Sequence, residues 1–464
     1  MGWGHALTEL LIRHCEVDGI DGLDVRIRDG IVVEIAPGLR RDAEELVDGG
    51  RGALIPGLHD HHLHLFALAA ALGSVNCGPG AVRDIADLAR RLQDAAARGQ
   101  VRGVGYFESV AGMLDRDVLD TFVADVPVRV QHRSGSVWFL NSAALVESGL
   151  ADSADPAVER DAAGRATGRL IRGDRLLQRP DRALPDLAEV GRLLASYGVT
   201  GVTDATPQLD VTVTTALHAA QDGGALPQRM LLLGAPLDAA QAAGVPWKIV
   251  VDEARGLDPA GLLEEIRVAH VASRPVAIHC TSRAETVLAV TALRTAGPEP
   301  GDRLEHAGVL PTEFDAELAR TGVTVVTQPH FIAGRGDGYL ENVEAGDHEL
   351  LYRCRTLIDA GVAVAAGSDA PFGSADPWSV ITAAVQRRTQ SGIVIAPPER
   401  VSARRALELF LGPALAPGGP PRRISPGTRA DLCLLSAPLD AVLAEPTADR
   451  LTATIVGGHV VYHA

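Results

Sequence analysis

The chain contains, between a β-branched run and an apolar segment, the stretch Ile55-Pro56-Gly57-Leu58-His59-Asp60-His61-His62-Leu63-His64. Side chains two positions apart in an extended strand point to the same face. His62 and His64 are therefore expected to project together, and His59 and His61 to project together on the opposite face. Two imidazoles on one side of a strand end provide half of a metal site. The alternative is a histidine-rich surface turn, and the rest of the chain decides between the two.

Length and net charge limit the class of protein to which the chain can belong. The 464 residues suit one large barrel with a smaller domain, and the apolar fraction of 46% is ordinary for a globular chain. A net charge of −16 argues against nucleic acid or an anionic membrane as a partner, because both are negatively charged. We therefore expect a small-molecule substrate, and a homodimer is left open.

The cysteines indicate the compartment. Cys15, Cys77, Cys280, Cys354 and Cys433 are scattered without paired spacing, which predicts a reducing compartment and no disulfide framework. The first residues lack the basic region, apolar core and small-residue cleavage site of a signal peptide. No apolar run is long enough to span a membrane. These features together predict a cytoplasmic protein.

Both ends of the chain have strand-like patterns. These patterns cover residues 10–12, 25–28 and 31–35, and then 431–435, 453–456 and 460–462. Asp29-Gly30 separates two of these runs and is a strong hairpin signal. Two β-rich ends around a long middle predict one small β-sandwich domain, built from residues 1–55 and 418–464.

Residues 56–417 alternate short apolar runs with helical patterns. The runs that indicate strands cover residues 128–130, 199–203, 230–233, 248–251, 276–278, 303–304, 323–326 and 362–365. Helical patterns between them include residues 85–97, 262–272, 285–295 and 313–320. Repeated β-then-α units predict an α/β fold with a parallel sheet, and their number favours a (β/α)8 TIM-like barrel. A doubly wound open sheet is the second choice, but no G-x-G-x-x-G follows the first strand.

Polar residues lie at the ends of several predicted strands, where a barrel of this kind has its active site. They are Lys248, His279, His306, His330 and Asp369. Taken alone, a histidine at a strand end is commonly a hydrogen-bonded rim residue, and an aspartate after Gly-Ser commonly caps a helix. Their coincidence in one chain favours a functional site. Imidazole and carboxylate ligands suit one or two divalent ions such as zinc, iron or manganese.

Such an ion would supply hydrolytic chemistry. A bound metal lowers the pKa of its water to near neutrality and so provides hydroxide without a strong base. Asp369 would accept a proton and pass it to a leaving amine. This arrangement hydrolyses an amide-like bond.

The chain resembles the amidohydrolase superfamily, most closely the subgroup of N-substituted formamide deformylases (metal-dependent hydrolases of the amidohydrolase family 3 type). The motifs that carry the resemblance are P-G-L-H-D-H-H-L-H, N-S-A-A-L, W-K-I-V-V-D, A-I-H, L-E-H-A, Q-P-H, G-S-D-A-P and P-G-T-R-A-D, which start at residues 56, 141, 247, 277, 304, 328, 367 and 426. The H-x-H after Pro-Gly, with the spaced His, His and Asp, is specific for the superfamily, whereas the subgroup rests on softer motifs. The resemblance implies a (β/α)8 barrel with a two-ended β-sandwich.

The resemblance also implies ligand roles. His62 and His64 match ligands of the more buried metal, with Asp369 as its further ligand and the proton shuttle. His279 and His306 match ligands of the second metal. Zinc is the metal that we favour.

Lys248 matches the lysine that the subgroup carboxylates to bridge two metals. An unmodified ammonium would be repelled by dications, so carboxylation is the sensible way to place a lysine there. If Lys248 is only a rim lysine, the site is mononuclear. His330 is a candidate for catalysis through substrate or oxyanion contact, with a structural role as the alternative. Arg283 and Glu305 are candidates to support the ligands.

Two departures from the family concern substrate binding. Cys280-Thr281-Ser282 stands where relatives tend to carry Gly-Asp, and Gly135-Ser136 stands where they often carry Gly-His. Cys280 is a candidate substrate contact, with a small buried residue as the alternative. Arg133 is a candidate partner for an acidic substrate group, or for a barrel carboxylate.

These patterns predict a metal-dependent amidohydrolase that cleaves a non-peptide C–N bond in an amide, formamide or cyclic amide-like substrate by metal-activated hydroxide. The enzymatic alternative is a deaminase of the same superfamily that uses one metal at His62, His64, His279 and Asp369. A non-catalytic barrel that serves as a scaffold would have lost ligands, and every expected ligand type is present.

Overall fold

The computed structural model describes residues 9–177, 184–239 and 242–464. Two compact units divide the chain. The first unit comprises Met1–Leu65 and Leu187–Ala464, and the second unit comprises Phe66–Asp186. The second unit is thus an insertion within the first. In the described part of the chain, no helix is long and apolar enough to cross a membrane.

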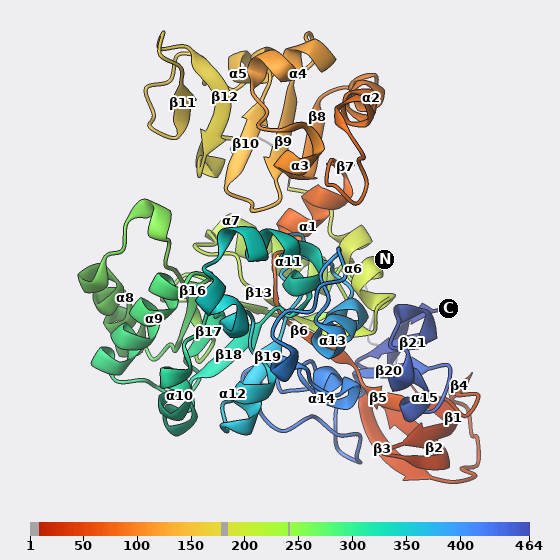
Figure 1. The fold of residues 1–464 in the computed structure, drawn as a ribbon. Coiled ribbons are helices and arrows are strands. Elements are labelled where there is room, and N and C mark those ends of the chain that lie inside the picture. The colour runs from red at the N-terminus through yellow and green to blue at the C-terminus, as the bar shows by residue number, and fades with distance from the viewer. Residues whose placement is uncertain (1–8, 178–183, 240–241) are drawn as a thin grey trace. The chain divides into compact units, whose positions relative to one another are not determined.

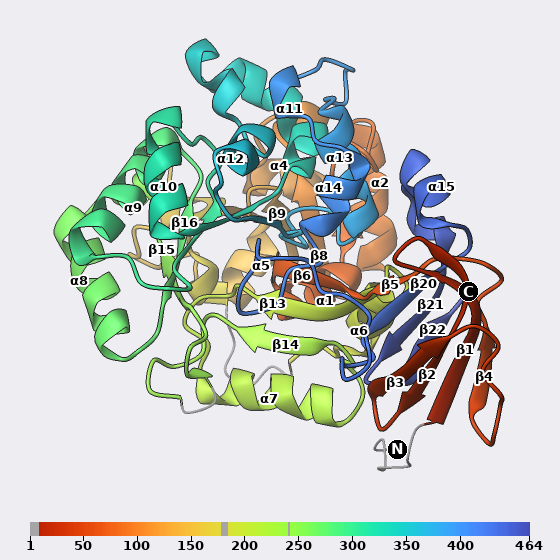
Figure 2. The ribbon, with the colours of Figure 1, turned by 90° about the horizontal axis from the view of Figure 1, so that it is seen from below.

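Both chain ends of the first unit form β-sheets. One sheet has the order β3-β2-β1-β4 and the other the order β22-β21-β20-β5. Their strands are β1 (Glu9–Val17), β2 (Ile20–Arg28), β3 (Ile31–Ala36), β4 (Glu45–Asp48), β5 (Leu54–Pro56), β20 (Leu432–Leu435), β21 (Leu451–Val456) and β22 (His459–His463). The N-terminal and C-terminal strands lie side by side (Figure 2).

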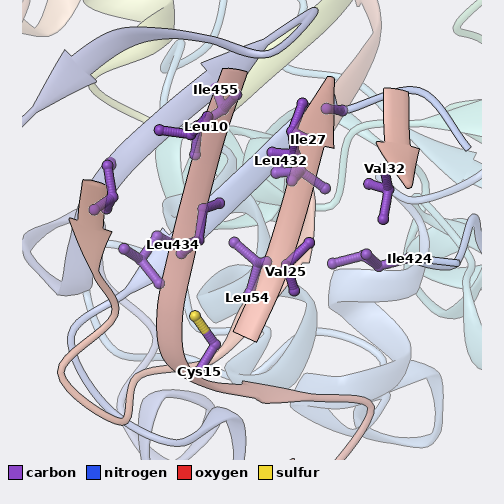
Figure 3. Packing of buried hydrophobic residues seen from close by; sticks show 14 of the residues in the cluster. Leu10, Cys15, Val25, Ile27, Val32, Leu54, Ile424, Leu432, Leu434 and Ile455 are labelled. Carbon is purple, nitrogen blue, oxygen red and sulfur yellow. The ribbon is translucent and has the colours of Figure 1, made fainter. Parts of the chain in front are cut away.

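A single hydrophobic cluster joins the two terminal sheets. Leu10 and Ile27 of the N-terminal sheet pack with Leu432 and Ile455 of the C-terminal sheet (Figure 3). Asp29-Gly30 connects β2 and β3 as a hairpin, and both residues have positive φ, as a tight hairpin turn requires. The alternating patterns at the chain ends therefore correspond to one shared β-core.

Within the described residues, eight parallel strands form the centre of the first unit. A three-stranded sheet has the order β14-β13-β6, and a five-stranded sheet has the order β15-β16-β17-β18-β19. Their bounds are β6 (Leu58–Leu63), β13 (Val199–Asp204), β14 (Arg229–Leu232), β15 (Trp247–Val250), β16 (Val276–Cys280), β17 (Arg303–His306), β18 (Thr324–Thr327) and β19 (Val364–Ala366). Backbone hydrogen bonds join both edges: Lys248 N–H donates to the Leu233 carbonyl (3.0 Å), and Asp369 N–H donates to the His62 carbonyl (2.7 Å).

Helices alternate with these strands, as the sequence predicts for an α/β fold. They are α6 (Ala188–Ala195), α7 (Val211–Asp222), α8 (Pro259–Val271), α9 (Arg283–Ala296), α10 (Asp315–Thr321), α11 (His330–Asn342), α12 (Arg355–Asp359), α13 (Pro377–Gln386), α14 (Ala403–Glu408) and α15 (Leu439–Ala444). Helix α9 begins at a capping box made by Ser282 and Glu285. Helices α8 and α9 pack against each other and against β16 (Figure 1).

The second unit has its own six-stranded sheet, of order β11-β12-β10-β9-β8-β7. Its elements are α1 (Leu65–Leu72, whose first residue belongs to the first unit), β7 (Val75–Asn76), α2 (Ile85–Ala96), β8 (Val101–Tyr106), α3 (Glu108–Ala111), α4 (Arg116–Phe122), β9 (Val128–His132), β10 (Val137–Leu140), α5 (Ser142–Glu147), β11 (Val158–Arg160) and β12 (Ala166–Ile171). The interpretation of residues 128–130 as a strand of the central parallel sheet is wrong, because they form β9 of this separate sheet.

Candidate metal centre

Three predicted ligands meet where β6 and β19 end. His62 lies in β6, His64 directly follows it, and Asp369 lies three residues after β19. Asp369 Oδ1 is 3.2 Å from His64 Nε2 and 3.5 Å from His62 Nε2. One ligand atom from each of the three residues lies within 4.8 Å of the others. His59 and His61 form a separate ring pair, with centroids 4.6 Å apart, which agrees with the alternation expected along this stretch.

The three residues fit a divalent transition ion. His62 is fully buried, and its Nε2 has no hydrogen-bond partner among the residues that the structure describes. A buried polar atom without a partner loses its hydration without compensation. Two imidazoles and a carboxylate are a donor set that such ions accept. The unpaired Nε2 and the donor chemistry therefore point to the same occupant.

Two more predicted ligands extend the row of imidazoles. The ring centroids of His62 and His306 lie 4.7 Å apart, and those of His306 and His279 lie 4.5 Å apart. His306 ends β17 and His279 lies at the end of β16, so both occupy the carboxyl ends of parallel strands. His306 Nδ1 lies 2.8 Å from Gln328 Oε1, which orients the ring. The sequence had indicated this clustering from the strand ends alone.

Lys248 on β15 belongs to the same cluster. Its side chain is buried, and its Nζ has no hydrogen-bond partner within the described ranges. Burial lowers the pKa of Lys248, and the charges of Glu305 and Asp369 only partly oppose that effect. Besides burial, the Lys248 charge lowers the pKa of His62 and of His279. An ammonium among these rings is therefore disfavoured.

The charge states of the ligands suit metal binding. Burial above all lowers the pKa of His62 to about 4 and that of His279 to about 3, so both rings are neutral at pH 7. Burial disfavours the Asp369 carboxylate, but the hydrogen bond from His64, together with the neighbouring His306 and His62, outweighs it and holds the Asp369 pKa below its usual range. Neutral imidazole and ionised carboxylate are the forms that bind metals.

Left-handed backbone conformations occur at two of these ligands. The φ angles are 49° at Asp369, 69° at His306 and 47° at Ala307. Residues with a Cβ seldom adopt positive φ, and such strain persists where the surroundings fix it, often at functional sites. The surrounding structure therefore holds Asp369 and His306 in backbone conformations that a free chain would rarely adopt.

Asp60 is a support that the sequence interpretation missed. Its Oδ1 accepts hydrogen bonds from the backbone N–H of His62 (3.1 Å) and of Ser368 (3.0 Å). The carboxylate thereby ties the β6 ligand segment to the residue before Asp369. Asp60 is fully buried, and burial raises its pKa to about 6. Its position inside the histidine cluster was the available signal.

The outcomes differ among the other predicted site residues. His330 is the first residue of α11 and is buried. Neither of its ring nitrogens has a hydrogen-bond partner among the residues described, and burial lowers its pKa to about 4. Cys280 is fully buried, with Sγ 3.7 Å from the Glu305 carbonyl, and burial raises its pKa to about 12, which favours a packed residue. Arg133 lies in the second unit, with its guanidinium carbon 3.3 Å from the Phe107 ring centroid. The substrate-binding roles of all three stay predictions.

Comparison with known proteins identifies the family. Residues 45–462 match the sequence model of the amidohydrolase family. The chain belongs to this family. The resemblance inferred from the sequence motifs is therefore confirmed, and the match runs from β4 of the N-terminal sheet through the parallel strands into β22.

Relatives of this amidohydrolase match along most of its length. The N-substituted formamide deformylase of Arthrobacter pascens is 27% identical over 508 residues, which cover 93% of this chain and 92% of that protein. The putative amidohydrolase YtcJ of Bacillus subtilis (strain 168) is 26% identical and covers 91% of each chain. A structure of an uncharacterised metal-dependent hydrolase from Pyrococcus horikoshii OT3 superposes with a TM-score of 0.73 at 20% identity, over 93% of this chain and 97% of the other. The structural likeness shows a shared α/β fold.

Proposed function

We propose that this amidohydrolase is a metal-dependent hydrolase that cleaves the C–N bond of an amide, formamide or cyclic amide-like substrate. The observation that carries the proposal is the group of His62, His64 and Asp369, whose ligand atoms lie within 4.8 Å of one another. The formamide deformylase relative supports the choice of bond.

We place this group at the mouth of a (β/α)8 barrel. The three-stranded and five-stranded sheets are both parallel, and backbone hydrogen bonds join them at both edges. Closure at both edges would bring all eight carboxyl ends to one rim, where barrel enzymes have their active sites. The four ligand histidines lie at such ends.

His62, His64 and Asp369 would hold one ion, and His279 and His306 would hold a second. Carboxylated Lys248 would bridge the two ions, which would also remove the disfavoured buried ammonium. Zinc suits the imidazole-rich set. When bound, such ions acidify water and polarise a carbonyl oxygen.

Asp369 would act first as a base and then as an acid. Its Oδ1 lies close to both His62 Nε2 and His64 Nε2. A water molecule bound in this site would therefore lie within reach of the Asp369 carboxylate. The water oxygen attacks the carbonyl carbon while one proton passes to Asp369. Asp369 then protonates the departing nitrogen as the C–N bond breaks. His330 would contact the substrate or the oxyanion.

A screen with metal-loaded protein tests the reaction. Protein loaded with Zn²⁺, Co²⁺ or Mn²⁺ is assayed against N-formyl amines, N-acyl amines and cyclic amides, with detection of the released acid and amine. Asp369→Asn should keep its metal but lose about 10²–10⁴-fold in turnover. Asp337→Asn is the matched control, because Asp337 pairs with Ser391 on the surface. Near-normal turnover of Asp369→Asn would remove Asp369 from the mechanism.

A mononuclear deaminase is the alternative. Among the described residues, only His62, His64 and Asp369 meet as a compact ligand group, which suits a single ion. A deaminase would release ammonia, so ammonia production with one bound metal per chain would decide for it.

A further inference from the structure

Strand β17 carries a buried ion pair next to the candidate metal centre. Arg303 and Glu305 lie two residues apart on this strand, and the exposed fractions of the residues are 1% and 0%. Arg303 Nε donates to Glu305 Oε1, and His62 Nδ1 makes a hydrogen bond with Glu305 Oε2. Each carboxylate oxygen of Glu305 therefore makes a hydrogen bond with one of these two partners.

The pairing with Glu305 determines which nitrogen of His62 is free. A neutral imidazole has one N–H, and an ionised carboxylate can only accept. With Nδ1 donating to Glu305, the lone pair remains on Nε2, which lies 3.5 Å from Asp369 Oδ1. Nε2 is also a buried atom that has no hydrogen-bond partner in the described part of the chain. The tautomer and the direction of the ring thus both prepare Nε2 as a ligand.

Arg303 contributes in two ways. Burial alone would raise the Glu305 pKa, but the charge of Arg303 and the hydrogen bond from His62 hold it well below its usual range, so the carboxylate stays ionised. Arg303 Nη2 also donates to the His61 carbonyl (2.9 Å), which belongs to the peptide bond that precedes His62. One guanidinium therefore fixes both the carboxylate and the backbone next to the ligand.

We propose that Arg303 and Glu305 are positioning residues that hold His62 as an Nε2 ligand and so set the metal affinity of the centre. This inference rests on the proposed function only in that His62 binds a metal. The competing interpretation is a structural ion pair. Replacing a buried pair by neutral residues is often close to neutral for stability, so stability and metal affinity can be separated.

The test compares two charge-removing variants of the full-length chain. Arg303→Met/Glu305→Gln removes the pair without leaving a lone buried charge. Arg353→Met/Asp315→Asn/Glu399→Gln is the control, because buried Arg353 pairs with Asp315 (2.6 Å) and its Nε lies 3.5 Å from Glu399 Oε1, so that all three charges are removed together. Zn²⁺ affinity is measured by competition with a chromophoric chelator, and ligand geometry is read from the visible spectrum of the Co²⁺-loaded protein.

The expected result is a Zn²⁺ affinity about 10–100-fold weaker for the first variant, with a shifted Co²⁺ spectrum. The control variant should keep the wild-type affinity and spectrum. A wild-type affinity and spectrum in the first variant would overturn the proposal. Equal losses in both variants would overturn it as well, because they would reflect general destabilisation.

A crystal structure of the Zn²⁺-loaded wild-type protein decides the matter even if the variants do not fold. His62 bound through Nε2, with Nδ1 on Glu305, supports the proposal. Coordination through Nδ1, or no coordination by His62, overturns it. If the wild-type protein binds Zn²⁺ as described but hydrolyses no amide, the proposed reaction fails and the positioning role stands.

Discussion

Gly367 lies where the β19 ligand segment touches β6, and a methyl group there should pull the metal centre apart. A Cβ at Gly367 would lie 2.6 Å from both the Cβ and the backbone N of His62, and 3.0 Å from its Cα. Ordinary contacts start at 3.4 Å, so a contact of 2.6 Å requires the two segments to separate by about 0.8 Å. The obstacle is backbone, which cannot rotate away as a flexible side chain can.

A shift of this size exceeds what a metal site tolerates. Metal–ligand distances hold to within about 0.2 Å, so a separation of about 0.8 Å between His62 and the Asp369 segment breaks the ligand group. Overpacking of this kind costs about 1–3 kcal/mol of stability. For Gly367→Ala we therefore expect a Tm lower by about 2–6 °C and a Zn²⁺ affinity weaker by at least about tenfold.

The assay is a chelator-competition titration together with thermal unfolding of the metal-free protein. Gly334→Ala is the control, because a Cβ at Gly334 of α11 meets nothing within 4 Å. Alanine there should keep the metal affinity and add about 0.5–1 kcal/mol of helix stability. If Gly367→Ala retains the wild-type Tm and Zn²⁺ affinity, then β6 accommodates the added methyl group without loss of stability or metal binding. The reasoning from close approach is then wrong.

Four further predictions address the same unit. Lys248→Met should reduce the bound metal by about half, measured by mass spectrometry of the metals, if the lysine bridges two ions; unchanged stoichiometry would make it a rim residue. Chelation of the metal should lower stability by about 2.7 kcal/mol relative to protein at 100 times the metal Kd, without loss of far-ultraviolet circular dichroism. His330 has a pKa of about 4 when folded against an ordinary 6.5, so the unfolded chain gains a proton first as the pH falls; stability should drop between pH 6.5 and 4, and His330→Gln should flatten that part of the Tm curve. Because burial raises its pKa to about 12, Cys280 should resist iodoacetamide at pH 8 until the protein unfolds, as followed by peptide mass spectrometry.

The residues of the candidate centre were predictable because they obey local rules. Alternation along a strand places His62 and His64 on one face, and the strand-end rule brings His279, His306 and Asp369 to the same edge. Both rules need only the neighbouring sequence. The proximity of the His62 ring to His306, and of His306 to His279, agrees with these rules.

The insertion and the supports were not predictable in the same way. Alternating strands and helices have the same local pattern in any α/β sheet, so residues 128–130 could not be assigned to a separate sheet from periodicity. The contact of Glu305 with His62 spans 243 residues and depends on strand order, which no local pattern encodes. Arg283, another candidate support, instead forms an ion pair with Asp347.

The supports of His62 have a common consequence for the metal-free protein. Asp60 accepts the His62 N–H, Asp369 donates its own N–H to the His62 carbonyl, and Arg303 donates to the carbonyl of the preceding peptide. None of these three bonds includes a metal, and all of them are buried. A ligand held on both of its peptide groups loses little further freedom when it binds, so affinity follows from preorganisation and not from folding around the ion. This is the reverse of small zinc-dependent domains, which unfold without their metal. The expected retention of circular dichroism after chelation therefore tests the backbone supports themselves, independently of which reaction the centre performs.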